Sequence, residues 1–398
     1  MRHLTTLCAL LSLAIFFLVL PSQLPSDVRA DTVQCSNETE CQKLIDDLSQ
    51  KIKDSRALQN TLQNKLNSLA NQIQLTSLQI QETQLQIASL SARIDNLEGN
   101  LNHLTDVFQR RTVETYQINS QLDPLALFLS SGNFVAFVER LKYLQVIQDS
   151  DHRLMVQLEE TRTNYDDQKT LAQLLSKKLG AQKSLLEQTK KENTALLAAT
   201  KNNELKYQQL LSQAQSQLAA IRQFVTLQGG ASLLSNQTKC DSWGCYYNQR
   251  DSQWGAMRLG SSDLSMAEYG CLVSSTAMIA KHYGKDINPV DIASDNASFF
   301  TGTDNHTALL LYSITVKGVN IQRTSLGANT SNIDKELSAG RPVIVGLFAG
   351  PGHFIVIKGG SNGNYIMDDP FVENGAEISF SSHYQLSNIT DVERVSVN

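Results

Sequence analysis

Apolar residues recur every seven positions along a stretch that begins near Ile45 and runs to Phe108. Two interleaved series share this spacing, one mostly isoleucine and the other mostly leucine. Such a sustained heptad pattern is typical of a left-handed coiled coil. We therefore expect one continuous helix over 45–108, which would be about 95 Å long at a rise of about 1.5 Å per residue. The first series is Ile45, Ile52, Gln59, Leu66, Ile73, Ile80, Ile87, Ile94, Leu101 and Phe108, and the second is Leu48, Ser55, Leu62, Leu69, Thr76, Thr83, Leu90, Leu97 and Leu104.

Two turn signals follow the heptads. The helix-breaking Pro124 comes first, and a Ser-Ser-Gly-Asn segment lies at 130–133. A second helical pattern then runs from about 135 to 228. The sequence thus predicts a long antiparallel coiled-coil hairpin over 31–228, with its tip at about 117–140.

Apolar side chains gather at this tip. These side chains could simply pack on one another. They could instead form a docking surface for a partner, because an apolar cluster at the far end of a rod has little core to join. The cluster consists of Leu125, Leu127, Phe128, Leu129, Phe134, Phe137 and Val138.

The segment from Asp123 to Leu144 resembles the hairpin-tip signature of the coiled-coil murein hydrolases and hydrolase activators of bacterial cell division. It has the Asp-Pro-Leu break, the Phe-rich short helix and the Arg-x-x-Tyr-Leu motif of that group. The resemblance extends over about 41–227, where it is coiled coil alone outside the tip. It implies that the tip binds a transporter-like division complex in the membrane, while the rod is either monomeric or a coiled-coil dimer. The residues that it nominates for this contact are Leu127, Phe128, Phe134 and Phe137.

The first thirty residues have the pattern of an export signal. A short basic start precedes an apolar run from Leu7 to Leu20, and small residues allow cleavage after Ala30. A run of fourteen residues is too short to cross a bilayer comfortably. We therefore expect a secreted or otherwise extracytoplasmic protein, at the cell surface or in the periplasm. The formal net charge of −5, with no basic stripe, argues against a nucleic-acid partner.

Five cysteines remain once the signal at 1–30 is set aside. Their spacing suggests two disulfides, although free or differently paired thiols stay open as alternatives. The candidate pairs are Cys35 with Cys41, at the start of the helical region, and Cys240 with Cys245, before the last domain. Cys271 has no neighbour in the sequence.

The apolar pattern changes after Tyr246 into a mixture of helix and strand. Gly270 precedes an amphipathic helical pattern at 271–283. About 150 residues of such mixed pattern can bury a core of their own. We therefore expect an α+β domain over 244–398, joined to the hairpin by a polar linker at 229–243. The predicted strands lie at 341–348, 353–358 and 364–367.

Candidate chemistry in this domain centres on Cys271. Its place in the first turn of a helix favours the thiolate, because free N–H groups there carry partial positive charge. His353 opens a strand and could take the thiol proton. Asp369 follows the adjacent strand and could orient the imidazole, with Asp368 as the alternative because neighbours on a strand point oppositely. The Gln249 amide and the Cys271 N–H could bind the oxyanion.

Each of these residues alone has an ordinary structural interpretation. A lone helical Cys is usually a small buried apolar residue, a lone His is usually hydrogen-bonded at the surface, and Asp before Pro is a common turn. Their joint occurrence in this order favours a cysteine hydrolase.

The C-terminal segment resembles the papain-like peptidases of the bacteriocin-processing (double-glycine leader) family and their relatives. The matching pieces are Tyr-x-x-Gln-x-Asp-x-x-Trp at 246–254, the Gly-Cys segment at 270–278, Gly-His-Phe-x-Val at 352–356 and Asp-Pro at 369–370. The resemblance implies that Cys271 is the nucleophile, His353 the general base, Asp369 the orienting acid and Gln249 the oxyanion donor. Gln249 lies 22 residues before Cys271, which is further than in the leader-processing members.

We therefore predict an exported cysteine peptidase of papain-like type that cleaves peptides of the bacterial cell wall, restrained by the hairpin until a membrane partner engages it. Two alternatives stay open: a secreted protease on polypeptides with the rod as a spacer, and a non-enzymatic activator of cell-wall hydrolases. The intact Cys/His/Asp set argues against the activator. We expect neither metal nor cofactor, because no HExxH or paired-Cys zinc motif is present.

Overall fold

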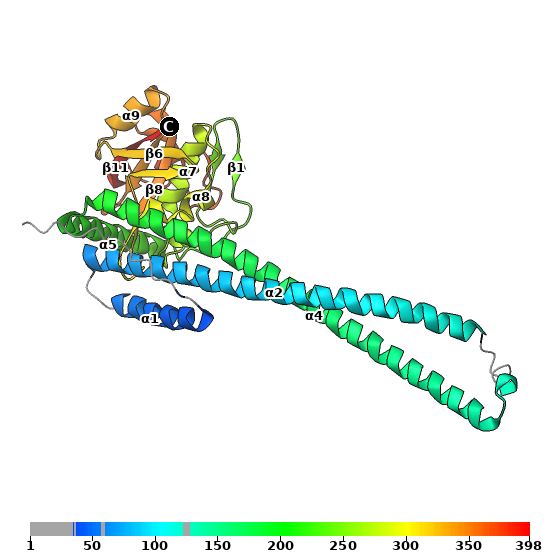
Figure 1. Ribbon diagram of the computed structural model, residues 1–398. Coiled ribbons are helices and arrows are strands. Elements are labelled where there is room, and N and C mark those ends of the chain that lie inside the picture. The colour runs from blue at the N-terminus through cyan, green and yellow to red at the C-terminus, as the bar shows by residue number, and fades with distance from the viewer. Residues whose placement is uncertain (1–34, 36, 57–59, 122–127) are drawn as a thin grey trace, which may run out of the picture. The chain divides into compact units, whose positions relative to one another are not determined.

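The computed structural model describes residues 35, 37–56, 60–121 and 128–398 (Figure 1). The predicted export signal at 1–30 and the tip residue Leu127 lie outside these ranges. Within them, no helix combines the length and the apolar character needed to cross a bilayer.

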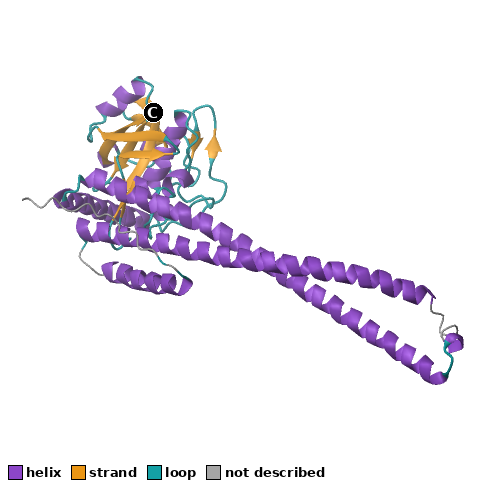
Figure 2. Ribbon diagram, in the orientation of Figure 1, coloured by secondary structure: helices purple, strands orange, loops and turns teal. Residues whose placement is uncertain are grey.

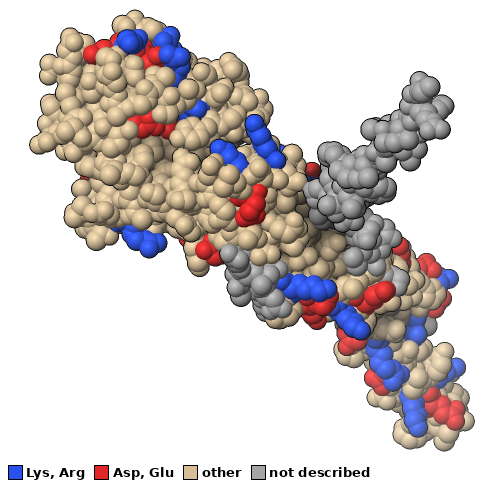
Figure 3. Space-filling model, turned by 90° about the vertical axis from the view of Figure 1, so that its left-hand side faces the viewer, with Lys and Arg blue, Asp and Glu red and all other residues tan. Residues whose placement is uncertain are grey.

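Long helices make up the N-terminal region (Figure 2). Helices α2 and α4 pack along one another, as the two helical patterns predict. Figure 3 shows Lys and Arg side chains interspersed with Asp and Glu along these helices, without a large patch of one sign on that face. The helices are α1 (Glu38–Arg56), α2 (Leu62–Gln121), α4 (Phe134–Thr200) and α5 (Glu204–Leu227).

The prediction of one continuous helix over 45–108 is wrong. The chain leaves the helix after α1, and α1 then lies antiparallel against α2. The Cys35 N–H donates to Gln81 Oε1 at 3.0 Å, and Ile45 joins an apolar cluster with Leu78. Helix α1 ends at Arg56, directly after the polar Ser55 of the second heptad series, where the apolar seam is interrupted.

The return helix predicted over 135–228 is also interrupted. Lys201 and Asn202 both have a φ of 51°, in the left-handed region that ends helices. Asn203 then caps α5, since its side chain accepts a hydrogen bond from the Lys206 N–H at 3.2 Å. Asparagine tolerates both conformations, so the Asn-Asn pair is the local cause of the break.

A seven-stranded antiparallel sheet forms the centre of the C-terminal domain (Figure 2). Its strand order is β10-β9-β8-β7-β11-β6-β5, so the C-terminal strand β11 lies between β7 and β6. The strands are β5 (Ser313–Val316), β6 (Val319–Ser325), β7 (Val343–Leu347), β8 (His353–Ser361), β9 (Asn364–Asp368), β10 (Ile378–Ser379) and β11 (Ile389–Val397).

Helices cover both faces of this sheet. Ile344 and Val356 join the apolar cluster of α7 (Cys271–His282), whereas Val343 and Val345 join that of Ile333 in α9 (Ser331–Ser338). Because both faces are buried, β7 is apolar throughout instead of alternating with polar residues.

Shorter elements surround the sheet. Two small hairpins, β1–β2 and β3–β4, lie outside it. The remaining elements are β1 (Lys239–Cys240), β2 (Cys245–Tyr246), β3 (Phe299–Thr301), β4 (Ala308–Leu310), α6 (Met266–Tyr269), α8 (Pro289–Ala293), η1 (Asn296–Ser298), η2 (Phe380–Ser382) and η3 (Leu386–Asn388).

Candidate active site

Cys271 is the first residue of α7 and comes directly after the one-turn helix α6. Between the two helices, a Cβ at Gly270 would lie 2.5 Å from the Met266 carbonyl oxygen. Only glycine therefore permits this close turn. The turn places the Cys271 side chain beside the free N–H groups at the start of α7. The thiol is buried, and it is the free cysteine of the described residues.

His353 is the first residue of β8, the strand against which α7 packs. Its Nε2–H donates to Asp369 Oδ1 at 2.8 Å, and both side chains are buried. Because this bond occupies Nε2, the other ring nitrogen, Nδ1, is left for the Cys271 thiol, which lies within hydrogen-bonding reach of the ring. The start of α7, the start of β8 and the end of β9 thus bring three nominated residues together.

The charges in this array stabilise one another. Burial alone would lower the pKa of His353, but the charge and hydrogen bond of Asp369, with the Cys271 thiol, raise it to about 9. Burial would raise the pKa of Asp369, but His353 and hydrogen bonds from Tyr384 and the Phe371 N–H bring it below its usual value. At neutral pH, an imidazolium therefore faces a carboxylate.

Asp368, the alternative orienting acid, points away from His353. Its Oδ1 accepts the Glu377 N–H at 2.7 Å, and its Oδ2 lies 3.5 Å from Lys358 Nζ. The alternation of side chains at the end of β9 thus turns Asp369, and not Asp368, toward the imidazole.

Gln249 is buried and links the two sides of the array. Its Nε2 donates to the Ala267 carbonyl in α6 at 2.8 Å, and its backbone N–H donates to the Pro370 carbonyl at 2.7 Å. The side-chain amide has two N–H groups, so this hydrogen bond leaves one of them available.

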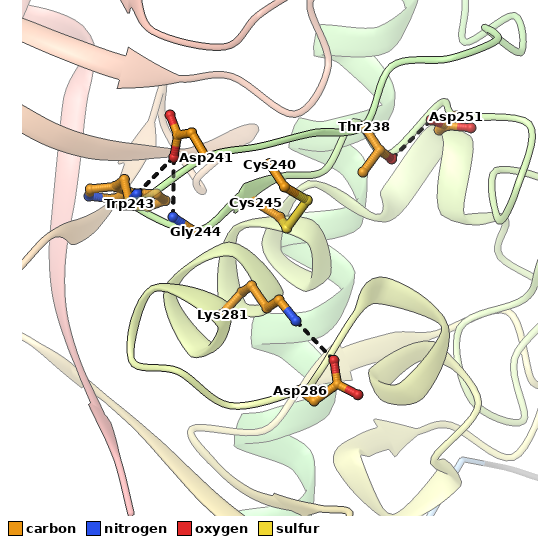
Figure 4. The surroundings of a disulfide bond; sticks show 9 residues. All are labelled: Thr238, Cys240, Asp241, Trp243, Gly244, Cys245, Asp251, Lys281 and Asp286. Carbon is orange, nitrogen blue, oxygen red and sulfur yellow. Dashed lines mark hydrogen bonds and ion pairs between the residues drawn. A yellow bond between two sulfur atoms is a disulfide. The ribbon is translucent and has the colours of Figure 1, made fainter.

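A disulfide links β1 to β2, the strand that ends at Tyr246 beside this site. Cys240 and Cys245 are paired across the β1–β2 hairpin, and Asp241 binds the N–H groups of the turn between them (Figure 4). Tyr246 follows directly, and its hydroxyl donates to the Asp369 carbonyl oxygen at 2.8 Å. This disulfide thus helps to position the backbone of Asp369. The other predicted pair, Cys35 and Cys41, is also at disulfide distance.

Helix α5 covers the imidazole. The rings of Phe224 and His353 are stacked, with centroids 4.3 Å apart and planes 8° apart. Phe224 is itself packed among Phe348 and Phe371. No pattern in the sequence predicts this contact, because Phe224 there only extends a helical pattern.

The backbone before His353 accommodates this helix. A Cβ at Gly352 would lie 2.9 Å from the Ala220 carbonyl oxygen in α5. Gly350 has a φ of +83° and also lies against Ala220 and Ser216. The two glycines therefore allow α5 to approach the loop before the imidazole closely.

A cavity of about 360 Å³ lies between α5 and the C-terminal domain. On the domain side, its lining includes Leu272 and Phe354, which directly follow Cys271 and His353 in the sequence. On the other side it is lined by Gln213, Ser216 and Gln217 of α5. Helix α5 is therefore one wall of this cavity, whose lining residues do not include Cys271 or His353.

The described part of the tip is exposed and aromatic. Phe128 is 51 % exposed and Phe134 is 69 % exposed. The Phe137 ring lies 5.2 Å from Phe128 and 6.4 Å from Phe134, centroid to centroid. The three phenylalanines nominated from the sequence thus form one cluster.

Residues 245–388 match the model of the Peptidase_C39 like family. The match supports a cysteine peptidase. The matched segment holds Gln249, Cys271, His353 and Asp369, whereas the helical region lies before it. Neither the curated proteins nor the solved structures contain a match to the chain.

Proposed function

We propose that this chain is an exported cysteine peptidase that hydrolyses amide bonds in cell-wall peptides and is regulated by its helical hairpin. The observation that carries the activity is the buried array in which the Cys271 thiol meets the His353 ring and His353 binds Asp369. The family match over 245–388 supports the same class of reaction.

The reaction passes through a thioester. With the proton held on the His353 imidazolium, the Cys271 sulfur attacks the carbonyl carbon of the scissile amide as the thiolate. The Cys271 N–H and the Gln249 amide bind the oxyanion, where loss of one donor costs roughly 10²- to 10³-fold in rate. The C–N bond breaks as the imidazolium protonates the leaving amine. A water molecule, deprotonated by the imidazole, then hydrolyses the thioester and the thiol is restored.

Regulation is supported by the position of α5. Phe224 lies flat on the imidazole, so a substrate can approach His353 only after α5 has moved. The same helix forms one wall of the cavity lined by Leu272, the residue after Cys271. Both contacts support a site that α5 covers.

A buried ion pair connects helices α2 and α4 to the part of the domain that contacts α5. Lys65 of α2 binds Glu192 of α4 at 3.1 Å, and Lys65 also donates to Thr301 Oγ1 in β3 at 2.8 Å. The neighbouring Phe300 ring packs on Tyr207 of α5, with centroids 5.1 Å apart. A change in the packing of α2 on α4 would therefore act on the strand that contacts α5.

The substrate and the partner follow from the resemblance of the hairpin to division murein hydrolases and their activators. The exposed aromatic cluster of Phe128, Phe134 and Phe137 supports a docking surface at the tip. A division complex in the membrane that binds this surface would move the hairpin and release α5.

The test compares three versions of residues 31–398: wild type, Cys271→Ala and Phe224→Ala. Each is incubated with purified peptidoglycan and with casein. We expect Phe224→Ala to release muropeptide ends faster than wild type, and Cys271→Ala to release none.

Two other outcomes would change the conclusion. Cleavage of casein alone would indicate a secreted protease that acts on polypeptides. No release by any variant, Phe224→Ala included, would favour the non-enzymatic activator of a cell-wall hydrolase.

A further inference from the structure

Tyr384 binds the oxygen of Asp369 that faces away from the imidazole. Its hydroxyl donates to Oδ2 at 2.7 Å. Oδ1, in contrast, accepts from His353 Nε2 at 2.8 Å and from the Phe371 N–H at 2.9 Å. Within the described part of the chain, no other hydrogen bond to Oδ2 is present.

We propose that Tyr384 is a positioning residue of the catalytic array, which fixes the plane of the Asp369 carboxylate so that Oδ1 stays aligned with the imidazole. This inference rests on the proposed peptidase function. Tyr384 lies after the sequence motifs of the candidate site, near the C-terminal end of the family match, and belongs to none of those motifs.

A second donor is needed because the terminal torsion of an aspartate is broad and roughly two-fold. Hydrogen bonds to Oδ1 alone allow the carboxylate to rock about its Cβ–Cγ bond, whereas a donor at Oδ2 holds the other end of the group. Hydrogen bonds from a hydroxyl to a carboxylate are short and about twice as strong as neutral ones.

The Tyr384 ring is itself held in place. Its centroid lies 6.0 Å from that of Phe348 and 5.9 Å from that of Phe380 in η2. The ring also lies 6.2 Å from the His353 ring. Two neighbouring aromatic rings therefore fix the direction of the hydroxyl, so that it is aimed at Asp369 before any substrate binds.

The other titratable groups around Asp369 come from three elements. They are His353 from β8, Cys271 from α7 and Tyr246 from β2, while Asp368 faces Lys358 on the opposite side. The hydrogen bond from Tyr384 lowers the pKa of Asp369. Its loss would let Asp369 take up a proton at a higher pH.

The first test needs no substrate. Tyr384→Phe keeps the ring and removes the hydroxyl, and Tyr365→Phe is the matched control, because Tyr365 donates to Asp334 at 3.0 Å, away from the array. In proton spectra of residues 31–398, the Nε2–H proton of His353 is identified by its absence in His353→Ala. We expect this downfield signal in wild type and in Tyr365→Phe, and its broadening or loss in Tyr384→Phe. An unchanged signal in Tyr384→Phe would overturn the proposal.

The second test measures kinetics in chains that also carry Phe224→Ala, so that the site is uncovered. We expect Tyr384→Phe to lower kcat roughly 10- to 100-fold, as for loss of one charged hydrogen bond. KM should stay within twofold, and the acid limb of the pH profile should move to higher pH. A fall in kcat with an unmoved acid limb would indicate a merely structural role and would refute the proposal. Absence of hydrolysis in every variant would refute the peptidase function, and the proton spectra would still decide whether Tyr384 holds Asp369.

Discussion

The stacking of Phe224 on His353 predicts that Phe224→Ala increases the activity of residues 31–398. Phe224 is 6 % exposed, and burial of such a side chain contributes about 1.5–3 kcal/mol. An aromatic pair adds about 0.5–1.5 kcal/mol. The substitution should therefore weaken the docking of α5 by about 2–4.5 kcal/mol, which shifts the equilibrium between covered and open sites by roughly 30- to 2000-fold. Activity rises by up to this factor, until the site is mostly open.

The assay is the initial rate of muropeptide release from purified peptidoglycan. Leu227→Ala is the matched control, because Leu227 lies on the same helix but is 76 % exposed. We expect its rate to stay within twofold of wild type. Hydrogen exchange over 216–224 should become faster in Phe224→Ala alone, because the helix is released there.

Two results would refute this reasoning. An unchanged rate together with unchanged exchange would mean that the Phe224 contact does not hold α5 on the site. An unchanged rate despite faster exchange would mean that α5 is released but that its cover does not limit hydrolysis. Cys271→Ala in the Phe224→Ala chain must abolish release, or the activity belongs to a contaminant.

Three further predictions concern pH, the buried ion pair and the tip. Folding raises the pKa of His353 from 6.5 to about 9. Protonation of His353 should therefore add up to about 3 kcal/mol to the free energy of unfolding below pH 6.5, and this contribution is lost as the pH rises through 9. Urea unfolding of wild type and of His353→Ala at pH 6.5 and pH 9 would measure it. Glu192→Gln should lower the free energy of unfolding by about 3–5 kcal/mol, because the buried Lys65 then lacks its negatively charged partner. Replacement of both residues by Leu and Met should restore most of the lost stability, as measured by urea unfolding. Phe134→Asp together with Phe137→Asp should abolish binding of residues 31–398 to membrane fractions without slowing hydrolysis by the Phe224→Ala protein. Equal binding would rule out the tip as the docking surface.

Local patterns account for what could be predicted from the sequence. The heptads predicted long helices, since a helix needs only its own apolar spacing and one packing partner. Gly270 before Cys271 predicted the start of α7, and the apolar run before Gly352 predicted the strand at 343–347. These signals lie within a few residues of the elements that they define.

The contacts that cover and position the site could not be predicted in this way. Phe224 and Tyr384 lie far from His353 in the sequence, and no spacing rule connects them, because the contacts depend on how α5 and the end of the chain pack on the sheet. The break between α1 and α2 had a local signal, namely polar residues in both heptad series, which the longer pattern outweighed. The Asn202-Asn203 pair was a similar signal for the end of α4.

The disulfide between Cys240 and Cys245 closes the hairpin whose last residue, Tyr246, donates to the Asp369 carbonyl. Disulfides form outside the cytoplasm, whereas cytoplasmic thiols are kept reduced. If the chain is exported as proposed, it lacks this disulfide before export, and fewer bonds then hold its carboxylate in place. On that proposal, the catalytic array would be completed only after the chain has left the cytoplasm.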